Sequence, residues 1–183
     1  MDLQDLKNMK NELALHLCLS ENTRNFSKKA LSKNDKRRVK KYPNLLNSST
    51  FKISRSLKAG VKRRSKFCMS HKNGCAGILF GKGKIGLDIE LLKPRDFEAV
   101  VQFCFSEDEL KIYENSKNKI LAFYQIYTAK EAMLKAENLG FSELGSVDIT
   151  KSAYTMKHFV VNDLFMVCII FKGKKDIIKI FYE

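Results

Sequence analysis

Carboxylates and lysines gather in two segments of this 183-residue chain, residues 84–90 and 121–140. In the first segment, KIGLDIE, apolar residues alternate with small or acidic ones, and this period of two predicts a half-buried β-strand. Asp88 and Glu90 would then project from the same face of the strand, about 7 Å apart. Both side chains can therefore reach one cation.

The second segment, LAFYQIYTAKEAMLKAENLG, repeats its apolar residues at helical spacing, and Gly140 is suited to end the helix. Glu131 and Lys135 are four residues apart and share one face, with Tyr127 one turn before Glu131. Two carboxylates from a strand and a third from a helix suit Mg²⁺, which takes oxygen ligands and often shares its shell with substrate phosphates. Lys135 would neutralise charge that grows on a phosphate. The pattern indicates a phosphoryl-transfer site.

Each segment taken alone also has an ordinary structural explanation. Asp88 and Glu90 can be solvent-facing residues of an antiparallel strand, and Glu131 and Lys135 can be a surface ion pair one helical turn apart. The chemical interpretation therefore depends on the two segments meeting in space.

Four short motifs, taken in order, carry a resemblance to a known family. They are Met69–Gly74 (MSHKNG), Gly86–Glu90 (GLDIE), Phe105–Glu109 (FSEDE) and Tyr127–Lys135 (YTAKEAMLK). This set resembles the 4′-phosphopantetheinyl transferases, whose motifs are S-H-x-x-G, G-x-D-x-E, F-S-x-x-E and W-x-x-K-E-A-x-x-K. The usual tryptophan of the last motif is Tyr127 here, which keeps an aromatic ring at the position.

The resemblance implies an enzyme that moves the phosphopantetheine arm of coenzyme A onto a serine of an apo carrier protein and releases adenosine 3′,5′-bisphosphate. Asp88, Glu90 and Glu131 would hold Mg²⁺ against the diphosphate, and Glu131 would also take the serine proton, directly or through a water. Lys135, together with Lys130, would bind the coenzyme phosphates and stabilise the developing charge. Catalysis would thus depend on Glu131 and Lys135.

The resemblance also implies coenzyme contacts in the first half of the chain. Arg38 matches a basic residue that helps to hold the 3′-phosphate, and it lies in the densely basic stretch Phe26–Tyr42. His71 matches the residue that contacts the nucleotide phosphate, and Ser70 belongs to the same motif. We therefore assign Arg38, Ser70 and His71 to coenzyme binding.

Two further positions have both a structural and a functional interpretation. Ser106 and Glu109 have the spacing of a helix capping box, and the resemblance gives Glu109 an auxiliary place near the active site.

The family usually has a second arginine after the position of Arg38 in the first half of the chain. That arginine is absent here, and Lys52 and Arg55 are the basic residues nearest to its place.

The resemblance and the order of the predicted elements indicate an α+β fold, a pseudo-dimer of two similar lobes that each pack a small antiparallel sheet against helices. We place the N-terminal lobe, with coenzyme phosphate contacts, at residues 1–83. The C-terminal lobe, with the metal site and the catalytic residues, would span residues 84–183. The alternative family architecture, a single lobe that forms trimers, carries its metal strand at the N-terminus, so a monomer is expected here.

Local patterns place the remaining elements. Alternating leucines predict a strand over residues 12–20, although a helix through Met9, Leu13 and Leu17 competes with it. A strand pair over 67–80 with a turn at 72–74 would continue through a hairpin at 81–84 into the metal strand. Helices are predicted at 33–42, 50–59, 96–103 and from 106, and strands that complete the second sheet at 147–149, 154–161, 164–171 and 176–182.

Composition limits the partners and the compartment. The net charge of +14 favours an acidic or polyanionic partner, and we expect an acidic acyl or peptidyl carrier protein rather than nucleic acid. Five cysteines without C-x-x-C spacing indicate free thiols in a reducing cytoplasm. No apolar stretch has the length of a membrane span, and the acidic start does not resemble a signal peptide.

Two other classes of function use similar residues. A Mg²⁺-dependent nuclease would need comparable carboxylates, but its lysine commonly follows a carboxylate by two residues on a strand, whereas Lys135 follows Glu131 by four on a helix. A non-catalytic nucleic-acid binder would use residues 28–66, where aromatic residues are too sparse for base stacking.

Overall fold

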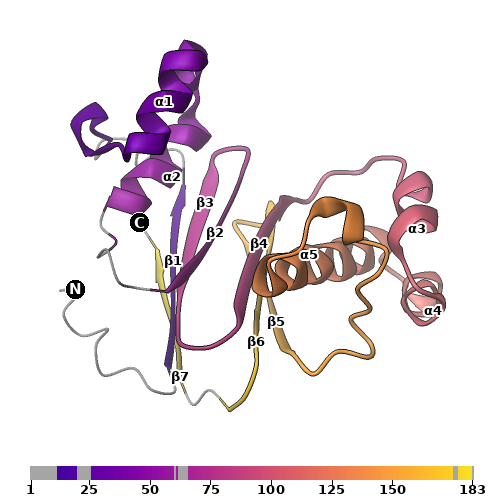
Figure 1. The fold of residues 1–183 in the computed structure, drawn as a ribbon. Coiled ribbons are helices and arrows are strands. Elements are labelled where there is room, and N and C mark those ends of the chain that lie inside the picture. The colour runs from indigo at the N-terminus through magenta and orange to yellow at the C-terminus, as the bar shows by residue number, and fades with distance from the viewer. Residues whose placement is uncertain (1–11, 20–25, 60, 62–65, 175–176, 183) are drawn as a thin grey trace. The chain divides into compact units, whose positions relative to one another are not determined.

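The computed structural model describes residues 12–19, 26–59, 61, 66–174 and 177–182 (Figure 1). The chain divides into two compact units. Unit 1 comprises Met1–Lys82 with Lys175–Glu183, and unit 2 comprises Gly83–Lys174. Each unit packs helices against a small sheet, so the predicted α+β class is confirmed. No helix among the described residues combines the length and the apolar character that a bilayer crossing requires.

The sheet of unit 1 has four strands in the order β2-β3-β1-β7. Strand β3 lies between β2 and β1 and runs antiparallel to both, while β7 runs parallel to β1. Helix α2 packs on this sheet, where Ile53 joins Cys18 and Ala76 in one buried cluster. The strands are β1 (Glu12–Leu19), β2 (Phe67–Lys72), β3 (Cys75–Phe80) and β7 (Ile177–Tyr182).

The C-terminal strand corrects the predicted sheet assignment. The sequence placed residues 176–182 in the second sheet, but β7 pairs with β1, with Leu13 opposite Ile178. Because β3 occupies only one edge of β1, the other edge keeps backbone groups that need partners, and β7 supplies them. The first sheet is therefore mixed rather than antiparallel, and the last residues of the chain belong to unit 1.

The predicted hairpin at residues 81–84 is also wrong. Strand β3 is already paired on both edges, and β4 (Ile85–Leu91) pairs with β6 (Phe165–Phe171) instead. Residues 81–84 therefore connect two sheets. The turn between β2 and β3 is confirmed, because Asn73 and Gly74 both have positive φ angles that suit a tight hairpin turn.

Helix α1 of unit 1 is rich in exposed basic residues, and a buried aspartate ties it to α2. Ser32 caps α1 by accepting a hydrogen bond from the Asp35 amide. The Asp35 side chain is buried and pairs with Arg55 at 2.8 Å and Lys58 at 3.2 Å, which ties α1 to α2. The elements are η3 (Lys28–Ala30), α1 (Lys33–Lys41), η4 (Pro43–Asn47) and α2 (Ser49–Ala59).

The sheet of unit 2 is antiparallel, in the order β4-β6-β5, and α5 packs against both β4 and β6 (Figure 1). Helix α4 packs against α5, and a cluster around Phe123 joins α3, α4 and α5 to the sheet residue Met166. The other elements are β5 (Thr155–Val161), α3 (Glu98–Cys104), α4 (Glu107–Asn115), α5 (Lys119–Glu137) and η5 (Phe141–Glu143).

Two local predictions fail in unit 2. Helix α5 ends at Glu137 and is capped by Asn138 rather than by Gly140, because Asn138 itself adopts the left-handed conformation with φ 58° that closes a helix. Residues 147–149 form no strand. Their backbone groups bond instead to buried side chains, through the carbonyl of Val147 and the amide of Ile149.

Candidate active site

Strand β4 places two carboxylates on the sheet face that α5 covers. Asp88 lies opposite Cys168 and Glu90 opposite Met166 on β6, and both of these neighbours belong to the core clusters beneath α5. The strand is not half-buried as predicted, since every residue from Ile85 to Glu90 is buried. Asp88 is only 2% exposed and Glu90 7%.

Gly86 allows α5 to approach this face closely. A Cβ atom at residue 86 would lie 2.0 Å from the backbone oxygen of Ala132, far inside any ordinary contact. Only glycine therefore fits where the helix backbone meets the strand. The residue next to Ala132 is Glu131, so the same close approach brings the third carboxylate over the strand.

The structure brings together the three carboxylates that the sequence selected. One oxygen from each of Asp88, Glu90 and Glu131 lies within 4.8 Å of the other two. Two of these side chains are buried and that of Glu131 is partly exposed. The convergence of two distant segments on one point is thus a finding, whereas metal binding by these residues stays a proposal.

Burial and repulsion between like charges shift the pKa of Glu131 in this cluster. Burial is the largest cause that raises the pKa of Glu131, and the negative charges of Asp88 and Glu90 raise it further. A hydrogen bond from Tyr127 and the charge of Lys135 act in the opposite direction without cancelling the rise. A divalent cation among these oxygens would relieve the repulsion, and hard carboxylate donors are the set that Mg²⁺ prefers.

Lys135 belongs to the cluster. Its ammonium donates to Asp88 Oδ1 at 2.6 Å and to the backbone oxygen of Leu87 at 3.1 Å. The side chain remains 31% exposed, so it connects the buried carboxylates to the surface of unit 2. A cation in this place can also meet an anionic ligand that approaches the three carboxylates.

Lys130 does not take the place that the sequence predicted. Its side chain is fully buried, and its ammonium donates to Glu109 Oε2 at 2.7 Å and to the backbone oxygen of Val147. Successive residues of a helix point about 100° apart, so Lys130 cannot share the direction of Glu131. Lys130 was expected to contact the coenzyme. The structure instead places its side chain in buried structural contacts.

Glu109 is the centre of this buried network. One of its oxygens accepts from Lys130 and from the Ser106 amide at 2.8 Å, and the other accepts from the Ile149 amide at 2.8 Å. The predicted capping box with Ser106 is confirmed. The auxiliary active-site role of Glu109 is replaced by a structural one, because the side chain is 0% exposed.

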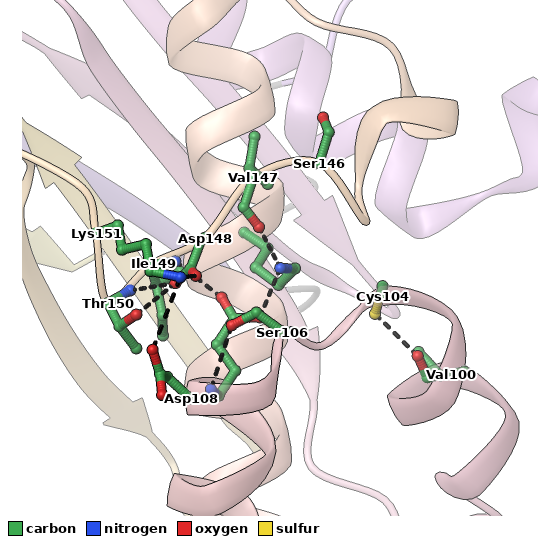
Figure 2. Close-up of polar contacts among 12 residues, drawn as sticks. Val100, Cys104, Ser106, Asp108, Ser146, Val147, Asp148, Ile149, Thr150 and Lys151 are labelled. Carbon is green, nitrogen blue, oxygen red and sulfur yellow. Dashed lines mark hydrogen bonds and ion pairs between the residues drawn. The ribbon is translucent and has the colours of Figure 1, made fainter.

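Exposed contacts continue the network around residues 146–151. Figure 2 shows Asp148 and Lys151 lying against Ser106 and Asp108 at the start of α4. Lys151 pairs with Asp148 at 3.2 Å and with Asp108 at 3.7 Å. The segment after α5 is thereby fastened to α4.

The predicted coenzyme residues of the first half lie in unit 1. Arg38 is exposed on α1, and β2 carries the exposed His71 beside the buried Ser70. Arg55 is 7% exposed and donates to Asp35, so it is a structural cation rather than a phosphate ligand. Coenzyme binding by Arg38, Ser70 and His71 stays a prediction.

The sequence did not predict the contacts that two of its noticed residues make in the site. Gly86 was noticed as part of the GLDIE motif, but its contact with α5 requires knowledge of which helix covers the strand. Tyr127 was noticed as an aromatic residue, but the sequence did not predict that burial, and next the charge of the neighbouring Glu131, would raise the pKa of its phenol. The spacing of four residues between Tyr127 and Glu131 was the available signal for that proximity.

Comparisons with known proteins agree with the motif resemblance. Residues 84–165 match the family model described as the 4′-phosphopantetheinyl transferase superfamily. A Haemophilus influenzae protein named "Putative 4'-phosphopantetheinyl transferase" is 27% identical over 92 residues, which cover 48% of this chain and 39% of that protein. The 4′-phosphopantetheinyl transferases AcpT of Salmonella typhi and Salmonella typhimurium are each 32% identical over 88 residues, 46% of either chain. The matched region thus spans less than half of each relative.

Proposed function

Because residues 84–165 match the model of the 4′-phosphopantetheinyl transferase superfamily, we propose that this protein transfers the 4′-phosphopantetheine arm of coenzyme A to a serine of an apo carrier protein. The serine oxygen would form a bond to the phosphorus that carries the arm. The bond from that phosphorus to the bridging oxygen of the diphosphate would break, and adenosine 3′,5′-bisphosphate would leave. The serine proton is then the one proton that the enzyme must remove.

The observation that supports this proposal most strongly is the convergence of Asp88, Glu90 and Glu131. Their donor chemistry fits a hard divalent cation, and we propose that they hold Mg²⁺. When bound, the ion would neutralise diphosphate charge and favour departure of the leaving group.

Glu131 is proposed to accept the serine proton, directly or through a water. Its pKa is raised by burial and by Asp88, which makes its carboxylate more basic than an exposed one. A base works best when its pKa approaches the working pH, so the raised value suits proton removal from a hydroxyl. The partial exposure of Glu131 leaves it accessible to the acceptor.

Lys135 is proposed to bind the coenzyme phosphates. It already lies against Asp88 and its side chain reaches the surface, so a phosphate near the three carboxylates would meet its ammonium. A fixed cation at the place where negative charge develops stabilises the transition state. Arg38, Ser70 and His71 of unit 1 are proposed as further coenzyme contacts, with Arg38 at the 3′-phosphate.

An acidic carrier protein is the proposed acceptor, because unit 1 offers it a basic surface. Asp35 is the only carboxylate in the sequence between Phe26 and Lys82, and it is buried against Arg55 and Lys58. The lysines and arginines of α1 are exposed. An acidic protein would be attracted to this surface at long range, which raises the association rate at low salt.

We further propose a monomer that acts in the cytoplasm. The cysteines Cys18, Cys68, Cys75, Cys104 and Cys168 are all free thiols, as proteins of reducing compartments usually have.

The decisive experiment follows the mass of the acceptor. Purified protein is incubated with coenzyme A, MgCl₂ and a panel of apo acyl and peptidyl carrier proteins, and each carrier is then weighed by mass spectrometry. We expect at least one carrier to gain one phosphopantetheine group, and Glu131→Gln to abolish the gain while the protein stays folded. A panel in which every carrier keeps its mass, or an undiminished gain with Glu131→Gln, would refute the proposed function.

A further inference from the structure

Helix α1 is held in place by charge rather than by an apolar face. Its nine residues, KNDKRRVKK, include six cations, and Asp35 is the only residue of the helix that is buried. The one apolar residue, Val39, is half-buried. Like charges three and four residues apart on a helix repel, so the cations do not stabilise it. The attachment of α1 to unit 1 therefore depends on Asp35.

Both carboxylate oxygens of Asp35 have partners. Its Oδ1 accepts from Arg55 Nε at 2.8 Å, and its Oδ2 accepts from Lys58 Nζ at 3.2 Å. The Ser32 hydroxyl also donates to Oδ2, at 2.5 Å. Charge-assisted hydrogen bonds of this kind are stronger than neutral ones. Because Arg55 and Lys58 belong to α2, this one carboxylate fixes the start of α1 against α2.

Helix α2 gives the ion pair a firm base. The Arg55 guanidinium carbon lies 4.8 Å from the ring centroid of Phe51, which restrains the arginine. Ile53 packs in a buried cluster with residues of the sheet, and the Thr50 hydroxyl accepts from the Gly74 amide at 2.8 Å in the β2–β3 turn. Helix α1 is thus tied through α2 to the sheet of unit 1.

We propose that Asp35 and Arg55 are positioning residues, whose ion pair sets the direction in which α1 presents Arg38 to the 3′-phosphate of coenzyme A. Arg38 follows Asp35 by three residues, so their side chains are neighbours on the helix surface. Asp35 is buried against α2 while Arg38 is exposed. The inference rests on the proposed function, because that function assigns Arg38 to this phosphate.

The charge of Asp35 and its positioning role predict opposite results for Asp35→Asn. The substitution removes a negative charge, so long-range attraction alone predicts tighter binding of any anion. Positioning predicts weaker binding of the 3′-phosphate, because an arginine binds phosphate through parallel hydrogen bonds that require a particular orientation. The sign of the change therefore distinguishes the two explanations.

The test compares coenzyme A with dephospho-coenzyme A, which lacks the 3′-phosphate. Both are titrated into the full chain with MgCl₂ and no acceptor, by isothermal titration calorimetry. The ratio of the two dissociation constants reports the 3′-phosphate contact. We expect the wild type to favour coenzyme A by about tenfold or more, as for a hydrogen bond to a charged group. Asp35→Asn and Arg55→Met should both largely lose this preference, although they change the net charge in opposite directions.

Ile53→Val is the matched control, since it weakens the packing of the same helix without removing a charge. It should keep the preference for coenzyme A. In an Arg38→Met background the preference is already absent, so Asp35→Asn should remove nothing further. Asp35→Glu keeps the charge but lengthens the side chain. It should also lower the preference, and it serves as the test if circular dichroism shows that Asp35→Asn does not fold.

Three results would overturn the inference. They are an unchanged or larger preference in folded Asp35→Asn or Asp35→Glu, an equal loss in Ile53→Val, and a wild type that binds both coenzymes equally well. A wild type that prefers coenzyme A but modifies no carrier would refute the proposed transfer alone, and the Asp35 variants would still decide the inference.

Discussion

Gly86 allows a direct test of how the helix and the strand form the site. In Gly86→Ala the new methyl group would lie 2.0 Å from the Ala132 oxygen, 2.8 Å from the Ala132 carbonyl carbon and 2.9 Å from Ile170 Cγ1. Because two of these atoms are backbone, rotating a side chain cannot relieve the clash. Restoring an ordinary contact of 3.4 Å requires α5 to move by roughly 1.4 Å. That movement carries Glu131 away from the strand.

We place the cost at the upper end for overpacked cores, about 3 kcal/mol. For a chain of this size, that loss corresponds to a fall in melting temperature of about 6–12 °C. Gly140→Ala is the matched control, since its nearest atom would be Ser142 Oγ at an ordinary 3.6 Å. Thermal denaturation followed by circular dichroism gives the stability, and calorimetry gives the Mg²⁺ affinity. If Gly86→Ala matches Gly140→Ala in both measurements, the proposed close packing of α5 on β4 is refuted.

Three other predictions concern stability and association. Lys130→Met should lower the free energy of unfolding by about 3–5 kcal/mol, because it leaves Glu109 charged and buried, and adding Glu109→Gln should recover part of that loss in urea denaturation. The pKa of Glu137 is lowered to about 2, chiefly by Lys84. Since the folded pKa is the lower one, this stabilisation is complete above the ordinary value of 4.5 and is lost as the pH falls toward 2. Glu137→Gln should therefore flatten the stability curve in that window, and an unchanged curve would contradict the assignment. The rate of carrier modification should fall as NaCl rises, and a salt-independent rate would remove the role of the basic surface.

Local periodicity predicted the parts of the site that depend on which way a side chain points. Alternation placed Asp88 and Glu90 on one strand face, and a spacing of four placed Glu131 and Lys135 on one helix face. Those rules follow from backbone geometry and do not depend on the rest of the fold. They placed each carboxylate on a face, and the motif resemblance supported joining the two segments into the one site where the structure brings the three carboxylates together.

Features that depend on distant partners were not predictable in the same way. The apolar pattern of β7 marks it as a strand but does not say which sheet edge is free, and that edge belongs to β1 at the other end of the chain. Lys130 is buried because Glu109 and the Val147 carbonyl neutralise and solvate its ammonium. Those partners lie on other segments, and lysine is usually exposed, so the sequence favoured a surface role.

Metal occupancy of the three-carboxylate cluster is the central claim, and anomalous diffraction tests it most directly. Crystals of the full chain are grown or soaked with MnCl₂, because Mn²⁺ prefers the same oxygen ligands as Mg²⁺ and scatters anomalously. We predict one strong anomalous peak bounded by the carboxylates of Asp88, Glu90 and Glu131. A crystal that contains Mn²⁺ at other sites, with no peak among these three side chains, would contradict the account.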